Sequence, residues 1–189
     1  YFTLISIIIL VLLVIATFYF FFLKDLPSPT KLSSSTGSLS TQIYDRNNQL
    51  LYTIYANRNQ TFTPIDKIPK TLQEATIAIE DKDFYKHGAF DLRGITRAAY
   101  STLFHKQVQG GSTITQQLVK NGLLTPERTL TRKIKELALS IVVEFMYPKD
   151  KILEMYLNQV PYGGTAYGVQ AAASTYFGKP VKSLTLAEQ

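Results

Sequence analysis

The chain of 189 residues contains no cysteine, which excludes disulfide bonds and thiolate metal sites. Acidic residues are scarce, with 14 Asp and Glu against 20 Lys and Arg, and the formal net charge is +6. Such a balance favours an anionic partner. The sequence has no basic run with interleaved aromatic residues, so nucleic acid is not the expected partner. It also has no internal repeat.

Charge is also missing from residues 1–23, which are apolar except for Thr3, Ser6 and Thr17. At about 1.5 Å per residue, a helix of this length spans roughly 30 Å, the thickness of a bilayer core. Core helices rarely run this long without a charge, and signal peptides have shorter apolar regions followed by a small-residue cleavage site. We therefore predict a single-pass membrane anchor, which makes phosphates at a membrane surface the preferred anionic partner.

The rest of the chain divides into three parts. Residues 24–40 are rich in Pro and Ser, which is typical of a juxtamembrane linker. Residues 41–70 begin with QIYDRNNQLLYTIY, which predicts a β-hairpin turning at Asn47 and Asn48, and continue as a proline-containing connector. Residues 71–189 have helical periodicity, and the end in LTLAEQ reads as part of another helix, so we expect a fragment at both ends. Helices are predicted at 71–85, 92–106, 113–122, 130–147, 149–159 and 166–176.

The first candidate for chemistry is the segment IAIEDKDFYKH. Ala75, Ile79 and Phe84 are predicted to share an apolar side of a helix, with Glu80 and Asp81 among them. A carboxylate held there would be partly desolvated, and desolvation raises a carboxyl pKa and suits a general acid or base. Acid clusters near helix ends are also common on solvated surfaces, and this segment alone favours that simpler interpretation.

The second candidate is the segment RTLTRKIKELALS. Arg132, Glu136 and Ser140 are spaced by four and share one helical face. An ordinary Arg132–Glu136 salt bridge is the simpler explanation of this spacing. With Arg128 and Lys133 nearby, the face also fits an anion site that holds one carboxylate. The core contact is expected from the opposite face, which carries Ile134, Leu137, Ala138 and Ile141.

The third candidate is GGSTITQQLVKN, in which two glycines precede neutral hydroxyls and amides. Thr113 and Gln116 match a capping box, so a helix is expected to start directly after the glycines. Such a helix N-terminus favours anions or sugar oxygens. A capped surface helix explains the capping residues, but not the paired glutamines together with Lys120 and Asn121. Hydroxyls and N-acetyl groups of a sugar could be bonded by Ser112, Thr115, Gln116 and Gln117.

Together these segments resemble the peptidoglycan glycosyltransferases, glycosyltransferase family 51. This family includes monofunctional transglycosylases and the N-terminal catalytic part of class A penicillin-binding proteins. The resemblance runs from about Ile43 to the end. Residues 41–70, the lead-in, are similar to the corresponding part of the class A proteins. Five motifs occur in order: EDKDFYKHGA at Glu80, GGSTITQQLVKN at Gly110, RKIKE at Arg132, KDKILEMYLN at Lys149 and YGVQAAASTYFGK at Tyr167.

The resemblance implies a mainly α, lysozyme-like glycosyltransferase domain over 71–189, C-terminally incomplete, with a membrane-dipping lobe beside the cleft. It implies polymerisation of lipid II into β-1,4 glycan strands, with inversion at the sugar and release of undecaprenyl pyrophosphate. Glu80 would deprotonate the acceptor hydroxyl. Glu136 would assist the leaving group directly or through a divalent cation, Mg or Mn. Cations that stabilise the phosphate charge would be Lys120, Arg128, Arg132 and Lys133.

The same resemblance implies further substrate-binding positions at Ser112, Thr113, Gln116, Gln117 and Asn121. The expected partners are lipid II, the growing glycan strand, membrane lipid and cell-wall synthesis proteins. The expected location is the outer face of a bacterial plasma membrane. Whether a transpeptidase domain follows is left open by the sequence.

Three positions depart from the family pattern. Ala89 stands where glycine is usual, Asp83 where a basic residue is frequent, and Ser140 where alanine is common. Of these, Asp83 is the change expected to alter affinity for the donor.

Two other functions stay open. A lysozyme-like lytic enzyme would also use a glutamate, but it has no pyrophosphate leaving group for a cation cluster to neutralise. A non-catalytic, membrane-anchored scaffold is disfavoured because both Glu80 and Glu136 are present.

Overall fold

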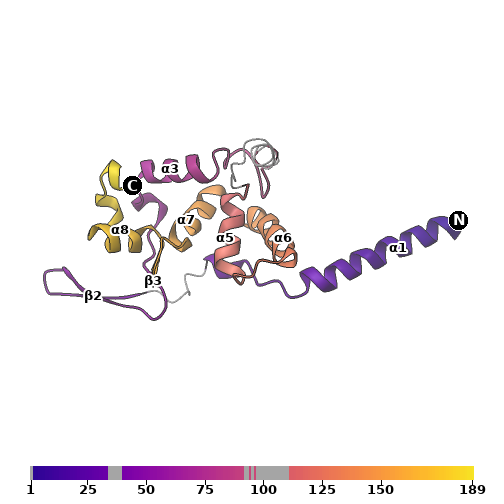
Figure 1. Cartoon of the computed structure of the whole chain (residues 1–189), viewed down its shortest axis with the longest axis horizontal. Helices are drawn as coiled ribbons and strands as arrows, with labels where there is room; N and C mark the ends of the chain where they lie inside the picture. Colours follow the sequence, from indigo (N-terminus) through magenta and orange to yellow (C-terminus); the bar gives the residue numbers. More distant parts are fainter. Residues whose placement is uncertain (1, 34–39, 92–93, 95, 97–110) are drawn as a thin grey trace.

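The computed structural model describes residues 2–33, 40–91, 94, 96 and 111–189. Helix α1 (Phe2–Phe18) continues into a π-helical turn, η1 (Tyr19–Leu23), and projects away from the helical body (Figure 1). The span Thr3–Leu23 has a mean hydropathy of 3.0 and none of it is buried. A core helix is therefore excluded here, and length and composition agree with the predicted membrane anchor.

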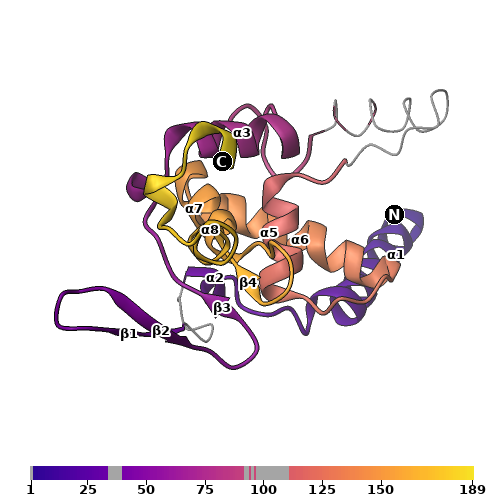
Figure 2. The same ribbon diagram turned by 60° about the vertical axis from the view of Figure 1, so that its left-hand side comes forward.

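The hairpin predicted from the sequence is confirmed. Strand β1 (Thr41–Tyr44) pairs with β2 (Leu50–Ile54) in antiparallel fashion, and Asn48 takes a positive φ of 60° in the turn. The Asp45 carboxylate accepts two backbone N–H groups of the turn, at 2.7 and 2.8 Å. The hairpin extends from the helical body on the side opposite α1 (Figure 2).

The mainly α fold is also confirmed. Predicted helices 113–122, 130–147 and 149–159 agree with the structure to within one residue at each end, whereas the predicted helix 92–106 falls almost wholly on residues outside the described part. The helical body consists of α3 (Lys70–Glu80), α5 (Ile114–Leu123), α6 (Leu130–Met146), α7 (Lys149–Gln159) and α8 (Val169–Phe177). Short 3-10 turns lie at Ile65–Lys67, Val181–Ser183 and Leu186–Glu188, the last of these within the terminal LTLAEQ.

Two predicted helix boundaries were wrong. The helix predicted over 71–85 ends at Glu80, because Asp81 leaves the helical conformation at φ −162° and ψ 71°. The helix predicted over 166–176 begins later, because Gly168 has φ 78°. A Cβ atom at Gly168 would lie 2.5 Å from the Asn158 carbonyl oxygen, so this close approach requires glycine.

The core forms where α5 packs between α6 and α7. Its fully buried side chains each contribute about 1.5–3 kcal/mol from removal of apolar surface from water. They include Phe84, Ile114, Leu118, Val143, Ile152 and Leu157. The segment 24–40, predicted as a linker, contributes α2 (Thr30–Ser33), whose Leu32 is buried in the same core. The carbonyl oxygen of Leu32 accepts a hydrogen bond from Gln159 at 2.9 Å, so this part of the segment is packed.

The lead-in is joined to the helical body by a second, two-stranded sheet. Strand β3 (Asn59–Gln60) runs parallel to β4 (Ala166–Tyr167), which lies just before α8. The Asn158 side chain at the end of α7 bonds both backbone groups of Thr63, at 2.7 and 2.8 Å. Residues 59–63 are therefore fixed against the end of α7 and against β4.

The buried face of α6 is the reverse of the predicted one. Glu136 and Ser140 are buried, whereas Ile141 on the expected core face is 42% exposed. The polar face can be buried because its groups are paired: Glu136 has two cationic partners, and the Ser140 hydroxyl donates to the Glu136 carbonyl at 2.7 Å. An exposed apolar strip remains along α6, formed by Leu130, Ile141, Val142, Phe145 and Met146.

Candidate active site

Glu80 is the last residue of α3, and its side chain is exposed. The amide of Gln117 on α5 donates a hydrogen bond of 2.7 Å to the Glu80 carboxylate. Phe84 is buried as expected, but Ile79 is 82% exposed. The solvated interpretation that this segment alone favoured therefore holds for Glu80, because the helix ends before it can bring Ile79 and Phe84 to one side, whereas Asp81 is buried. The Glu80 carboxylate is accessible, and among the described residues the Gln117 amide holds it.

Two tyrosines lie near this carboxylate. The Tyr156 hydroxyl donates to the carbonyl oxygen of Gln117 at 3.3 Å, which leaves the NH₂ end of that amide directed at Glu80. Burial raises the pKa of Tyr156, and the Glu80 charge adds to the effect. Burial and Glu80 likewise raise the pKa of Tyr162 to about 12. Both phenols therefore stay protonated, and Tyr156 stays a donor, when Glu80 is ionised.

A cavity of about 210 Å³ opens beside Glu80. Its lining includes Ser112 and Thr113 from the segment that leads into α5, together with Lys82 and Asp91. The structure thus brings the predicted base and two predicted substrate-binding residues to one cavity.

The N-terminus of α5 shows half of the predicted capping box. The Thr113 hydroxyl accepts the Gln116 backbone N–H at 3.2 Å, but the Gln116 side chain donates to the Ala89 carbonyl at 2.8 Å. Thr113 also donates to that carbonyl, at 3.3 Å. Thr113 and Gln116 are both buried, so their polar groups support the fold around Ala89.

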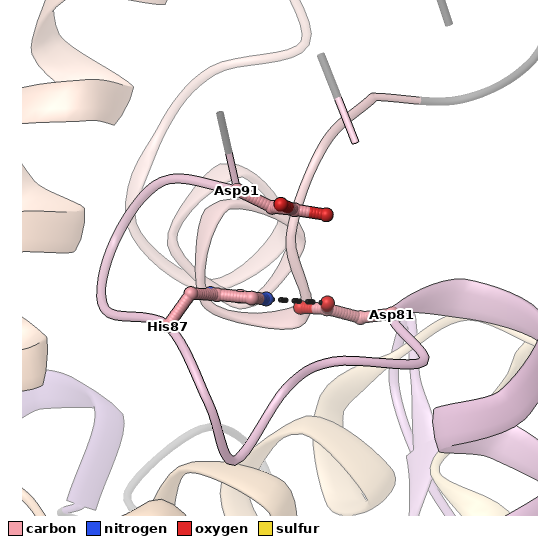
Figure 3. Close-up of side chains that lie close together, drawn as sticks. All are labelled: Asp81, His87 and Asp91. Carbon is pink, nitrogen blue, oxygen red and sulfur yellow. Dashed lines mark hydrogen bonds and ion pairs between the residues drawn. The ribbon is translucent and has the colours of Figure 1, made fainter. Parts of the chain in front are cut away.

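Asp81 completes this cap, a role that the sequence interpretation missed. One of its carboxylate oxygens accepts the Ile114 backbone N–H at 3.0 Å, and the other lies 2.6 Å from Nε2 of His87. Nδ1 of His87 donates to the Gly88 carbonyl at 2.7 Å. Asp91 faces the same group (Figure 3), and ligand atoms of the three side chains lie within 4.8 Å of one another. Because Asp81 and His87 satisfy each other and the helix end, capping explains the Asp81–His87 pair.

Glu136 lies on α6 and is 1% exposed. Arg132 contacts one carboxylate oxygen at 2.7 Å, and Lys133 contacts the other. Lys133 also reaches Ser112 and the Gln116 carbonyl oxygen, at 3.3 Å each. The sequence correctly placed Arg132 and Glu136 on one face, and the simple salt bridge is present.

The surroundings of Glu136 do not fit a divalent cation. Mg²⁺ and Mn²⁺ bind several oxygen ligands, whereas both oxygens of Glu136 are engaged by cationic side chains. Within the described residues, the one group of metal-ligand composition is Asp81, His87 and Asp91.

A second cavity, of about 450 Å³, collects most of the predicted cations. Lys120, Asn121, Arg128 and Arg132 line it, and Lys133 points instead toward Ser112. One acidic residue, Glu127, also lines this cavity. The sequence interpretation missed one further lining residue, Arg58 of the lead-in, since nothing in its local pattern marks it.

The departure at Asp83 is compensated in part. Its carboxylate pairs with Lys86 at 3.0 Å. The expected effect of Asp83 on the donor site is therefore reduced, because a neighbouring cation screens its charge.

The exposed Glu80 thus lines one cavity, and the charged residues that line a second cavity are mostly cations. The chain belongs to the transglycosylase family, whose family model, described as Transglycosylase, matches residues 47–189. Membership agrees with the resemblance found in the five motifs.

Individual relatives support the same family. The chain is 47% identical over 171 residues to penicillin-binding protein 1A of Rickettsia conorii, covering 88% of this chain and 22% of the relative. It is 48% identical over 166 residues to penicillin-binding protein 1A of Aquifex aeolicus, covering 87% and 23%. Penicillin-binding protein 1F of Bacillus subtilis is 47% identical over 150 residues, covering 79% and 21%. The chain thus spans less than a quarter of the length of these relatives.

Proposed function

We propose that this chain is a peptidoglycan glycosyltransferase that polymerises lipid II into β-1,4 glycan strands and releases undecaprenyl pyrophosphate. Family membership supports the reaction class. The observation that carries the proposal lies on α5. Gln117 bonds Glu80, and Lys120, three residues further along and so about 4.5 Å along the axis, lines the cationic cavity. One rigid helix therefore links a base to an anion site.

In this proposal Glu80 is the general base. Its carboxylate takes the proton from the 4-hydroxyl of the acceptor sugar as that oxygen attacks C1 of the donor. The bond between C1 and the phosphate oxygen breaks, and its electron pair leaves with the pyrophosphate, so the configuration at C1 is inverted. Gln117 holds the Glu80 carboxylate in place. Because Glu80 is exposed, there is room for the acceptor hydroxyl beside it.

The cations act on the leaving group. Lys120, Arg128 and Arg132 stabilise the charge that grows on the pyrophosphate, which fixed cations do without reorganisation during the reaction. Glu136 has no carboxylate oxygen free of a cation, so we assign it a positioning role through Arg132 and Lys133. Ser112 and Asn121 remain candidates for sugar oxygens.

We place the domain at the outer face of a bacterial plasma membrane. The apolar span of α1 and η1 would anchor it there. The exposed strip on α6 supports contact with lipid, since a strip of this kind is costly in water. Lipid II, the growing strand and membrane lipid would then be its partners.

The test is incubation of the whole chain with lipid II in vesicles, followed by separation of the products. Glycan strands and undecaprenyl pyrophosphate are expected. A lytic enzyme would shorten preformed strands and make none, and a scaffold would do neither. Failure of a folded, membrane-inserted chain to make strands would overturn the proposal.

A further inference from the structure

Arg58 lies beside the cationic cavity although it comes from the lead-in, far from the segments that supply the other cations. Its guanidinium carbon is 4.5 Å from the centroid of the Tyr167 ring. The backbone next to it is fixed, because β3 pairs with β4 and the Asn59 N–H donates to the Thr165 carbonyl at 2.8 Å. Tyr167 and the β3–β4 pair therefore set the direction of this side chain.

The guanidinium is free to bind a ligand. Within the described part of the chain, the guanidinium contacts the Tyr167 ring, and no carboxylate pairs with it. A guanidinium stacked on a ring keeps its N–H donors at its edge, where they match the oxygens of a phosphate. Arg58 is exposed, so those donors remain accessible.

The charge around the cavity is unbalanced. Arg58, Lys120, Arg128 and Arg132 line it against one acid, Glu127. Arg132 is paired with Glu136, yet its Nε is buried without a hydrogen-bond partner among the described residues. Like charges gathered in one cavity repel one another, and an anionic ligand removes that repulsion.

We propose that Arg58 is a fourth cation of the pyrophosphate site, so that the lead-in supplies part of the donor site. This rests on the proposed function, because it names the pyrophosphate of a lipid-linked donor as the ligand. The competing explanation is a purely structural stack that holds the lead-in against β4.

The experiment measures binding of a moenomycin-type phosphoglycolipid to the whole membrane-anchored chain, with thermal stability in parallel. Arg58→Gln is expected to weaken binding about tenfold, as for loss of a charged hydrogen bond. Arg58→Lys keeps the charge and should lose less affinity for the glycolipid. Arg46→Gln is the matched control, since Arg46 is an exposed arginine in the turn of the same lead-in. With the glycolipid held well below its Kd, inorganic pyrophosphate should displace it from the wild type, and about tenfold more pyrophosphate should be required for Arg58→Gln.

Three results would overturn the inference. One is equal affinity of Arg58→Gln and Arg46→Gln for the glycolipid. Another is no displacement of the glycolipid by pyrophosphate. The third is an equal loss of affinity in Arg58→Gln and Arg58→Lys that tracks a fall in Tm, as a structural stack predicts. Turnover of lipid II is a separate measurement: if the wild type makes no glycan, the proposed function fails, while Arg58-dependent binding would still support the anion site.

Discussion

Gln117 donates a hydrogen bond of 2.7 Å to the carboxylate of Glu80, a residue 37 positions earlier in the chain. The amide can do this in one orientation only, because its carbonyl oxygen accepts from Tyr156. Carboxylate, amide and phenol thus form a hydrogen-bonded chain that runs from α3 through α5 to α7. The Glu80 carboxylate is oriented by residues that are themselves held in the packed core.

This chain predicts the effect of Tyr156→Phe. The ring is 3% exposed and keeps its packing, while the hydroxyl that orients Gln117 is lost. A hydrogen bond of about 1 kcal/mol corresponds to a fall of roughly fivefold in kcat, with little change in KM. Steady-state kinetics on lipid II measure both constants. Tyr147→Phe is the control, because it loses a hydroxyl bonded at 3.1 Å to Ser33, away from Glu80. Equal kcat in the two variants would show that the Tyr156 hydroxyl does not contribute to catalysis.

The cation site predicts the effect of Arg132→Ala. Loss of this guanidinium should weaken lipid II and phosphoglycolipid binding together, by roughly 1.5–3 kcal/mol or about tenfold and more. Affinity should be measured at low and at high salt. Because salt screens the charge of Arg132, the loss of affinity in Arg132→Ala should be smaller at high salt if it comes from charge. Unchanged affinity with a lower Tm would mean that the Arg132–Glu136 pair is structural only.

The position of these residues was only partly predictable from the sequence. The four-residue spacing of Arg132 and Glu136 was sufficient to place them together, and three helices followed from their apolar periodicity. The buried face of α6 was not predictable, because it depends on Glu136 finding a cation on each oxygen. Arg58 was not predictable either, since it reaches the site through strand pairing with residues more than 100 positions away.

Alkaline pH should destabilise the fold through the tyrosines near Glu80. The pKa of Tyr162 is raised from its ordinary value of 10.0 to about 12, so the folded state holds this proton more tightly than the unfolded state. The stabilisation is complete below pH 10 and is lost as pH rises toward 12. Thermal unfolding between pH 8 and about 12 should show this fall. The fall in thermal stability should be smaller in Tyr162→Phe than in the wild type. An identical pH dependence in the two proteins would refute the raised pKa of Tyr162.

Glu80→Gln tests the central claim most directly. The amide keeps the size of the side chain and removes the base. The polymerisation rate of lipid II by the membrane-anchored chain should therefore fall by about 10²-fold or more, with phosphoglycolipid affinity and Tm unchanged. Wild-type turnover by a folded Glu80→Gln protein would contradict the account.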